Sequence, residues 1–315
     1  MENVKKTPYL CTLSETGLIH VAGKDAERFL HNQLSYKIEG LQAVEAPLAA
    51  WHDSKGRVRA LLRVLVLHDG WLLLVHKSQT ETLITQMSGF ILREDVVLQN
   101  VTGKWYAAAL VAKTSNALET YIAGYGITLS QEFSTVIWKK STAWVRIGPE
   151  LVQMFCPRDQ RPKILTDLST GNSAIAKIAE IRLGIPSVTR EFEACFIPHL
   201  LNLDTLGAVV FDKGCYPGQE IIARAQNLGT VKRRMFRFSM KSTHTPAPST
   251  PLEDSGGTRH GEILCAASQD GLVEMLAVVS LEGAKKKLFI RKEAGLTAVK
   301  LELLPYAPLH EEEEK

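Results

Sequence analysis

The sequence predicts an α+β protein that ends in a small β-barrel. Two successive stretches mix strand-like alternation of apolar residues with segments of helical spacing. The last third contains strand-like pieces with no helix between them, which is typical of a small barrel. A chain of 315 residues is long enough for two or three compact modules, each with its own core.

The first stretch, residues 1–104, follows the order strand, helix, strands, helix, strand. The predicted strands are residues 18–22, 46–52, 57–67, 71–76 and 96–101. The first predicted helix covers residues 24–34, and Ser78 with Glu81 forms a predicted capping box for the second. A split βαβ sheet of the ferredoxin-like kind produces this order of elements.

The second stretch, residues 105–228, also mixes predicted strands with predicted helices. Its predicted strands are residues 106–111, 142–147 and 151–155, and its predicted helices are residues 114–123, 159–168 and 173–183. Gly184-Ile-Pro186 ends the last of these helices. An irregular passage, residues 187–213, then leads into a motif around Cys215, and loops of this length are often functional.

The third stretch, residues 229–308, is the predicted barrel. Its strands are expected at residues 231–240, 259–267, 272–281, 287–290 and 298–304. Residues 241–257 are rich in Thr, Pro and Ser, which is typical of a loop. Residues 309–315 form a charged tail that we expect to be disordered.

Composition excludes several classes of protein. With 45% hydrophobic and 23% charged residues the chain is an ordinary globular protein, and a net charge of +3 is too small to argue for nucleic acid. The cysteines, at positions 11, 156, 195, 215 and 265, include no C-x-x-C pair, which argues against a disulfide framework or zinc ribbon. No run of 18 apolar residues and no N-terminal apolar h-region are present. We expect a cytoplasmic protein without a metal site or membrane segment.

The main functional candidate is Cys215, in the segment Lys213-Gly-Cys-Tyr-Pro-Gly-Gln-Glu220, called here the cysteine signature. Pro217 and Gly218 suit a turn that opens a helix, and a thiol before a helix start is near partial positive charge. Lys213 and Arg224 add positive charge, which favours the thiolate, the form that attacks electrophiles or binds metal. A buried structural cysteine behind a tight turn is the alternative.

The cysteine signature resembles that of the YgfZ family of folate-binding proteins, Lys-Gly-Cys-Tyr-x-Gly-Gln-Glu. The similarity extends to Gly184-Ile-Pro186, Phe196-Ile-Pro198 and Asp53-Ser-Lys-Gly56. It implies a ring of three modules around a central channel, a fold shared with the glycine-cleavage T-protein. It also implies binding of tetrahydrofolate or a one-carbon derivative in a central cleft, with Cys215 at its edge. The implied role is support of iron–sulfur client enzymes, including enzymes that methylthiolate tRNA.

Several further residues become candidates through this resemblance. The motif itself consists of Gly214, Tyr216, Gly218, Gln219 and Glu220 around the thiol, and the candidate folate contacts are Lys213, Arg224, Asn202, Asp53, Lys55 and Arg57. Lys213 and Arg224 would hold an anionic folate tail or neutralise Glu220. The segment around Asp53 also fits ordinary turn chemistry, and the amide of Asn202 would bind a pteridine edge or cap its own loop.

Three positions depart from the family pattern. Thr16 and Ala176 stand where the resemblance implies aromatic residues in contact with folate, so both stacking faces are absent. His199, the nearest histidine upstream of Cys215, stands where related sequences carry Gln. A Cys215–His199 pair is therefore not a matched feature of the family, although a nucleophilic thiol normally needs a nearby base.

Direct binding of nucleic acid is not expected. Arg224, Lys232, Arg233, Arg234 and Arg237 form a basic cluster, but alternation along a strand divides it between two faces, and no RNP-type aromatic motif accompanies it. Any effect on tRNA would be indirect. Two other functions stay open. One is tetrahydrofolate-dependent aminomethyl transfer, as in the T-protein, with Asp53 as a conceivable carboxylate. The other is a folate-free scaffold that docks partner proteins.

Overall fold

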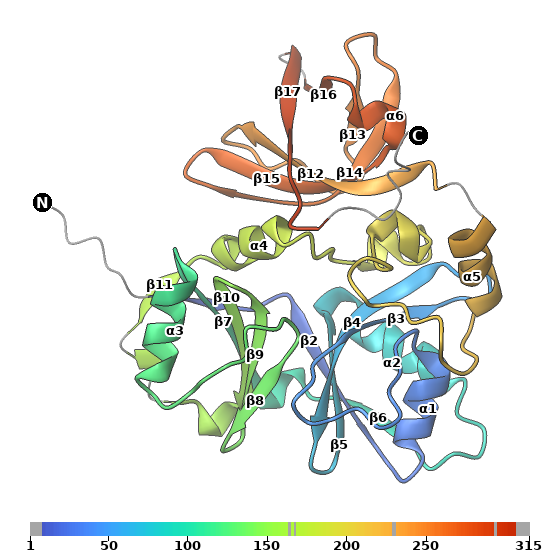
Figure 1. Ribbon diagram of the computed structural model, residues 1–315, viewed down its shortest axis with the longest axis vertical. Coiled ribbons are helices and arrows are strands. Elements are labelled where there is room, and N and C mark those ends of the chain that lie inside the picture. Colours follow the sequence, from blue (N-terminus) through green and yellow to red (C-terminus); the bar gives the residue numbers. More distant parts are fainter. Residues whose placement is uncertain (1–7, 163–164, 167, 229–230, 293–294, 307–315) are drawn as a thin grey trace, which may run out of the picture.

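The computed structural model describes residues 8–162, 165–166, 168–228, 231–292 and 295–306. Two α+β modules lie side by side, and a β-barrel packs across both of them (Figure 1). The predicted fold class is confirmed. The predicted tail, residues 309–315, lies outside the described residues.

The first module contains a five-stranded antiparallel sheet in the order β3-β4-β5-β2-β6. Its strands are β2 (Thr16–Ala22), β3 (Leu48–His52), β4 (Val58–Leu67), β5 (Gly70–His76) and β6 (Val97–Asn100), and its helices are α1 (Ala26–Gln33) and α2 (Thr80–Ser88). The predicted capping box is wrong. A 3-10 turn, Lys77–Gln79, precedes α2, and the Ser78 hydroxyl lies 2.8 Å from His76 Nδ1 and is not the cap of α2.

The second module contains a six-stranded sheet in the order β11-β1-β7-β10-β9-β8. Its strands are β1 (Tyr9–Thr12), β7 (Trp105–Val111), β8 (Val136–Lys139), β9 (Thr142–Gly148), β10 (Leu151–Pro157) and β11 (Ser169–Gly171), with helices α3 (Ser115–Ala123) and α4 (Ser173–Arg182). Strand β1 pairs with β7, so residues 9–12 belong to this sheet and not to the sheet of the first module. Alternation alone does not specify which sheet a strand joins.

One predicted helix of the second module is not found among the described residues. Where residues 159–168 were expected to be helical, the described residues contain a 3-10 helix at Arg158–Gln160 that ends before Pro162. Proline lacks the backbone N–H that a helix interior requires, which explains the early end.

The third module is a closed barrel in the order β12-β15-β14-β13-β16-β17. Its strands are β12 (Arg233–Lys241), β13 (Pro251–Glu253), β14 (Arg259–Gln269), β15 (Leu272–Ser280), β16 (Leu288–Lys292) and β17 (Gly295–Glu302). Helix α5 (Gln219–Leu228) precedes the barrel, and the short α6 (Leu281–Ala284) follows β15. Closure pairs the strand edges, which removes exposed edges from this module.

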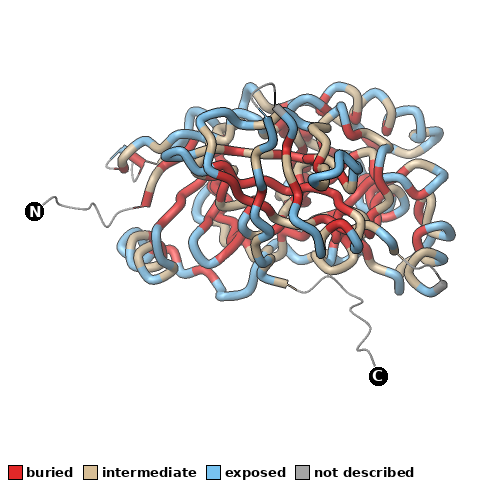
Figure 2. Tube along the Cα trace, turned by 90° about the horizontal axis from the view of Figure 1, so that it is seen from above, coloured by how far each residue is buried: buried red, intermediate tan, exposed pale blue. Residues whose placement is uncertain are grey.

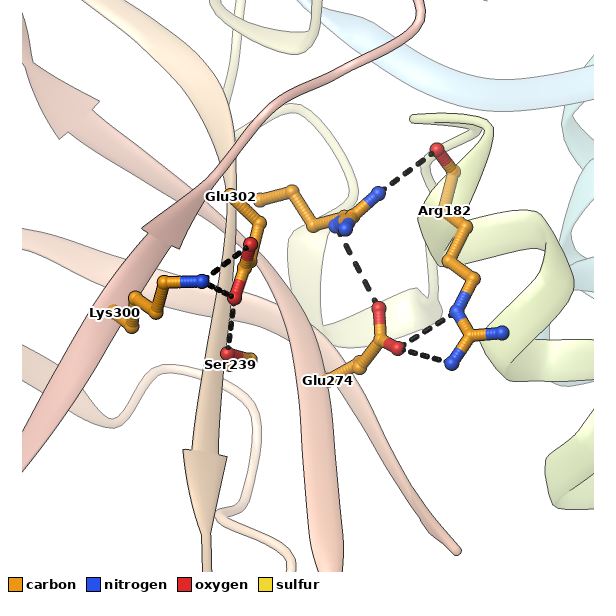
Figure 3. Close-up of polar contacts among 6 residues, drawn as sticks. Arg182, Ser239, Glu274, Lys300 and Glu302 are labelled. Carbon is orange, nitrogen blue, oxygen red and sulfur yellow. Dashed lines mark hydrogen bonds and ion pairs between the residues drawn. The ribbon is translucent and has the colours of Figure 1, made fainter.

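A shared core joins the modules. One buried cluster includes Leu61 of β4, Ile178 of α4, Tyr216 of the cysteine signature and Leu264 of β14, and buried segments run through the interior in Figure 2. An ion-pair network adds to this contact (Figure 3). The buried carboxylate of Glu274 on β15 accepts a 2.7 Å hydrogen bond from Arg182 Nε at the end of α4, and Arg237 lies 3.6 Å away. Helix α4 is therefore fixed to the barrel.

Across the described ranges, no helix combines the length and apolar character needed to cross a membrane.

Candidate functional site

A cavity of about 550 Å³ lies where the three modules meet, and is called here the central cavity. Its wall is formed by the turn between β1 and β2, by β4 and β5, by α4, by residues 185–189, and by β14 with the loop before β13. Its volume is within the range of small-molecule sites. Apolar side chains cover much of the wall, among them Leu48, Leu61, Leu74, Ile147, Val188 and Leu264.

Six ionisable residues from all three modules line this cavity. One of them, Arg63, donates to the backbone carbonyl of Ala46 and, at 3.0 Å, to Ser134 Oγ. The other five are Glu15, His76, Lys177, Glu180 and Cys265, called here the cavity cluster. Glu180 Oε1 accepts a 2.8 Å hydrogen bond from Gln153 Nε2, and Glu180 Oε2 lies 3.6 Å from Lys177 Nζ. His76 Nε2 lies 3.4 Å from Glu15 Oε2.

Burial controls the charge states in the cavity cluster. It raises the pKa of the Cys265 thiol, a shift that nearby Lys177 opposes. Burial also lowers the pKa of Lys177, but the charges of Cys265 and Glu180 outweigh that effect and leave the pKa raised. Burial lowers the pKa of His76 as well. At neutral pH these shifts favour a neutral imidazole at His76 and a protonated thiol at Cys265.

Thr16 and Ala176, the two positions without the expected aromatic rings, both line the central cavity. The small side chains leave its wall at these points without a flat surface on which a ring could stack.

The cysteine signature lies outside the central cavity. Cys215 is exposed, which excludes the buried structural alternative. Among the described residues, those that line the cavity do not include Cys215, so the expectation that the thiol lies at the cavity edge is wrong. Tyr216, the next residue, points into the shared core, where 6% of its surface is exposed.

The turn at the tip of the β3–β4 hairpin supports the cysteine signature. Asp53 Oδ1 accepts hydrogen bonds of 2.9 Å from the backbone N–H groups of Lys55 and Arg57, which is ordinary turn chemistry. Gly56 has a φ of +71°, and a Cβ built there would lie 3.2 Å from the carbonyl oxygen of Gly218. Sequence analysis thus grouped two motifs that the fold brings into contact.

Lys213 joins the signature to α1. Its ammonium donates to the backbone carbonyls of His31, Leu34 (2.7 Å) and Tyr36 (3.3 Å), and it lies 5.1 Å from the Tyr216 ring centre. An ammonium has three N–H donors, one for each carbonyl, and a cation suits a helix C-terminus. Burial lowers the pKa of Lys213 to about 8. The side chain is committed to the fold, away from the residues that line the cavity.

Asn202 and His199 are also committed to the fold. The buried Asn202 amide donates 2.8 Å to the Met235 carbonyl and accepts 3.4 Å from the Met235 N–H, so the expected contact with a pteridine is wrong. Asn202 has a φ of +55° directly after the 3-10 helix Pro198–Leu201, where it fits as a cap. The ring of His199 is 1% exposed, and its Nε2 lies 2.9 Å from Gln226 Oε1 on α5.

The remaining basic candidates divide into exposed and paired residues. Lys55 and Arg57 are exposed at the hairpin tip, and Arg224 is exposed on α5 one turn after Glu220. Three arginines of the predicted basic cluster are paired instead: Arg234 with Asp204 at 2.8 Å, Arg233 with Glu262 and Arg237 with Glu274. Most of the charge that could contact phosphates is therefore neutralised within the chain.

No family model matches the chain. It is 26% identical over 325 residues to the tRNA-modifying protein YgfZ of Klebsiella pneumoniae (strain 342), covering 95% of this chain and 93% of that protein. It is 27% identical over 313 residues to the tRNA-modifying protein YgfZ of Sodalis glossinidius (strain morsitans), with the same coverage. The chain is therefore similar to YgfZ proteins over nearly its whole length.

The fold of this protein is also found in a solved structure. The glycine cleavage system aminomethyltransferase T from Bartonella henselae superposes with a TM-score of 0.71 at 15% identity, covering 96% of this chain and 87% of that one. The likeness establishes a T-protein fold, as the resemblance implied.

Sequence analysis missed the cavity cluster. Lys177 and Glu180 are three residues apart on one face of α4, which is a usable but common signal. Nothing in the sequence connects them to Cys265 in the barrel or His76 in the first module. Metal ligation is not indicated either: within the described part of the chain, no three His, Cys, Asp or Glu side chains are grouped to hold an ion.

Proposed function

We propose that this protein is a folate-binding accessory protein that supports iron–sulfur cluster assembly or repair. Through client enzymes it would promote tRNA modification by methylthiolation. The observation that carries the proposal is the central cavity, closed by all three modules of a T-protein fold. The names of the relatives, tRNA-modifying proteins, support the link to tRNA.

The residues of the central cavity fit a reduced folate. A carboxylate accepts two parallel N–H donors, and Glu180, supported by Gln153, offers such an acceptor to the amino and amide edge of a pteridine. Leu61, Ile147 and Leu264 would cover the ring with aliphatic surface in place of stacking. In this account Glu180 and Gln153 orient the ligand, while the apolar wall excludes water.

The exposed Cys215 would act on a partner protein. The β3–β4 hairpin connects both places: Leu48 and Leu61 line the cavity, while the tip at Gly56 contacts the signature. His52, at the end of β3, also packs on Tyr216, with ring centres 5.9 Å apart. A ligand that shifts the base of the hairpin would therefore also shift the loop that carries the Cys215 thiol. Since the basic residues are mostly paired, the effect on tRNA would pass through the client enzyme.

The test is complementation in cells that lack the native protein. Cys215→Ala is expected to lose most rescue of tRNA methylthiolation and of cluster-enzyme activity while the fold survives, because one exposed sulfur contributes little stability. Cys195→Ala, which removes the other exposed thiol, is the matched control and should rescue fully. Full rescue by Cys215→Ala would refute a functional thiol.

Aminomethyl transfer is the second candidate, and the carboxylate of Glu180 in the cavity favours it over a role for Asp53, whose carboxylate is engaged in its turn. Incubation with an aminomethylated lipoyl carrier and tetrahydrofolate separates the two functions. Formation of methylene-tetrahydrofolate would establish the transferase, and its absence supports the accessory role. A folate-free scaffold would give no heat when titrated with tetrahydrofolate.

A further inference from the structure

A short series of polar contacts beside the central cavity has a geometry that the proposed function does not use. Ser78 Oγ lies 2.8 Å from His76 Nδ1, and His76 Nε2 lies 3.4 Å from Glu15 Oε2. A hydroxyl, an imidazole and a carboxylate therefore follow one another. This is the order of a serine nucleophile, its base and the residue that orients the base, an arrangement recognised by geometry and not by position in the sequence.

The sheet of the first module brings these three residues together. Strand β2 pairs with β5 so that Thr16, the residue after Glu15, lies opposite His76. The backbone N–H of Lys77 donates 2.7 Å to the Glu15 carbonyl, which ties the turn before β2 to the residue after His76. Ser78 belongs to the 3-10 turn that follows β5 directly. Backbone pairing therefore fixes the relative places of the three side chains.

The hydrogen bonds also determine where the protons lie. His76 Nδ1 accepts 3.2 Å from the backbone N–H of Ser78, so the proton of the neutral ring is on Nε2, the nitrogen that faces Glu15. Ser78 Oγ accepts 3.2 Å from the backbone N–H of Arg190. Since Nδ1 carries no proton, the Ser78 hydroxyl donates to it. The basic nitrogen of the imidazole is therefore in place to take the hydroxyl proton.

Ser78 lies next to the wall of the central cavity. Glu15 and His76 line the cavity, and so does Thr189, the neighbour of Arg190. Ser78 itself is exposed, so an incoming group can reach its hydroxyl. Helix α2 begins two residues later, and within the described part of the chain no side chain caps its N-terminus. Its free N–H groups carry partial positive charge, which stabilises an oxyanion that develops nearby.

We infer that Ser78, His76 and Glu15 form a second reactive site, which removes the formyl group from an N-formyl reduced folate. The inference rests on the proposed function, because the folate of the central cavity would supply the formyl group. In this site Ser78 is the nucleophile, His76 is the general base and acid, and Glu15 is a positioning residue for the imidazole. Transfer of a formyl group to a hydroxyl requires no oxidant or reductant.

The reaction has two steps. In the first, Ser78 Oγ bonds to the formyl carbon and the hydroxyl proton passes to His76 Nδ1. The carbon–nitrogen bond then breaks, and the folate nitrogen leaves with the proton from Nδ1, so that Ser78 carries a formyl ester. In the second, water attacks the ester carbon, one water proton passes through Nδ1 to Ser78 Oγ, and formic acid leaves. The sum is formyl-folate and water in, reduced folate and formic acid out.

The test incubates the full-length protein with 10-formyltetrahydrofolate and measures the release of formate. Ser78→Ala and His76→Gln should each lower the rate by about 100-fold or more, the contribution of acid–base help to such a step. Ser115→Ala is the matched control, because the Ser115 hydroxyl donates 2.8 Å to a carboxylate, that of Glu119, and it should keep the full rate. Ser78 is exposed, so Ser78→Ala should unfold at the same temperature as the natural protein.

A fluorophosphonate probe tests the nucleophile without folate. Peptide mass spectrometry should find the probe on Ser78 in the natural protein and not in His76→Gln. Glu15→Gln should keep the labelling but move the midpoint of its pH profile to lower pH, because the Glu15 carboxylate raises the pKa of His76. The charges of Lys177 and Glu180, which act on the same ring, stay unchanged in this variant. An unmoved midpoint would exclude Glu15 from the site.

Failure of the inference differs from failure of the proposed function. If the natural protein binds tetrahydrofolate but releases formate no faster than Ser78→Ala, deformylation alone is overturned. If the probe labels Ser78 but tetrahydrofolate does not bind, folate is overturned both as the substrate of this site and as the ligand of the proposed function. Labelling of Ser78 that persists in His76→Gln overturns the role of the imidazole.

Discussion

Gly218 of the cysteine signature and Gly56 of the β3–β4 hairpin pack backbone against backbone. A Cβ on Gly218 would lie 2.6 Å from the Cα of Gly56 and 2.5 Å from the Asp53 carbonyl oxygen. Gly218 also has a φ of +78°, a conformation that side chains disfavour. Both positions need glycine because the two segments leave no room for a side chain, and their contact fixes the loop that presents Cys215.

Gly218→Ala is therefore expected to destabilise the protein more than an ordinary glycine substitution. Gly207→Ala is the matched control, because Gly207 has a similar φ of +67° but nothing within 4 Å of its built Cβ. The control should lose about 1 kcal/mol through backbone strain alone, and Gly218→Ala about 3 kcal/mol or more. Urea unfolding measures both, and equal losses would contradict the close backbone contact.

Lys213→Met should weaken the attachment of the signature to α1. Removing the ammonium leaves three carbonyls at the helix end without this donor, at an expected cost of about 1–3 kcal/mol. Hydrogen exchange of the segment that follows α1 should accelerate as well. Lys55→Met, at an exposed position, serves as the comparison and should change neither quantity. If the two variants behave alike, Lys213 does not anchor the signature.

The buried His52 is expected to make the protein less stable to unfolding in acid. Its ring is buried, and burial followed by the charge of His199 lowers its pKa to about 3, against about 6.5 in an unfolded chain. Between these values the unfolded state binds a proton that the folded state does not, so stability falls as the pH falls from about 6.5 towards 3.

His52→Phe should remove this contribution. Neither ring nitrogen of His52 has a hydrogen-bond partner among the described residues. Replacing the imidazole by a phenyl ring therefore breaks no hydrogen bond found in this part of the chain. Urea unfolding at about pH 5 and about pH 7 should show a smaller difference for His52→Phe than for the natural protein. His68→Phe, at an exposed position, is the control. An unchanged difference in His52→Phe would show that other groups cause the acid sensitivity.

Sequence analysis predicted most elements of the fold because their periodicity is local. Residues 57–67, a mostly apolar run between two turns, were predicted as a strand and became β4, and residues 173–183 have helical spacing and became α4. The failures involve competition between local and distant interactions. Ser78 bonds with His76 instead of capping α2, and β1 crosses to the sheet of the second module. A sequence pattern does not reveal which partner is available.

The candidate site likewise contains parts that the sequence predicted and parts that it did not. The short motifs around Gly56 and Gly218 were recognised because their residues are adjacent in the sequence. The central cavity was not, because its wall combines Glu15, Lys177 and Cys265 from three modules, each residue unremarked in its own segment. Lys213 and Asn202 were expected to contact a ligand, but their polar atoms are satisfied by backbone groups.

Thr16→Trp should strengthen binding of tetrahydrofolate. Thr16 is half-buried in the cavity wall, and a ring there would add a stacking surface worth about 1 kcal/mol, or about a fivefold lower Kd. Ala176→Trp is a different case, since Ala176 is 2% exposed on α4 and a large ring there should cost about 1–3 kcal/mol of stability. Calorimetric titration and thermal unfolding distinguish the two effects. A weaker Kd in Thr16→Trp would place the ligand elsewhere.

The central claim is that folate binding and the functional thiol occupy different places, the cavity and the exposed loop. Calorimetric titration of tetrahydrofolate into the natural protein and into Cys215→Ser tests it most directly. We predict binding heat in both proteins with the same Kd. The account would be contradicted if the natural protein gave no binding heat, or if it bound tetrahydrofolate and Cys215→Ser did not.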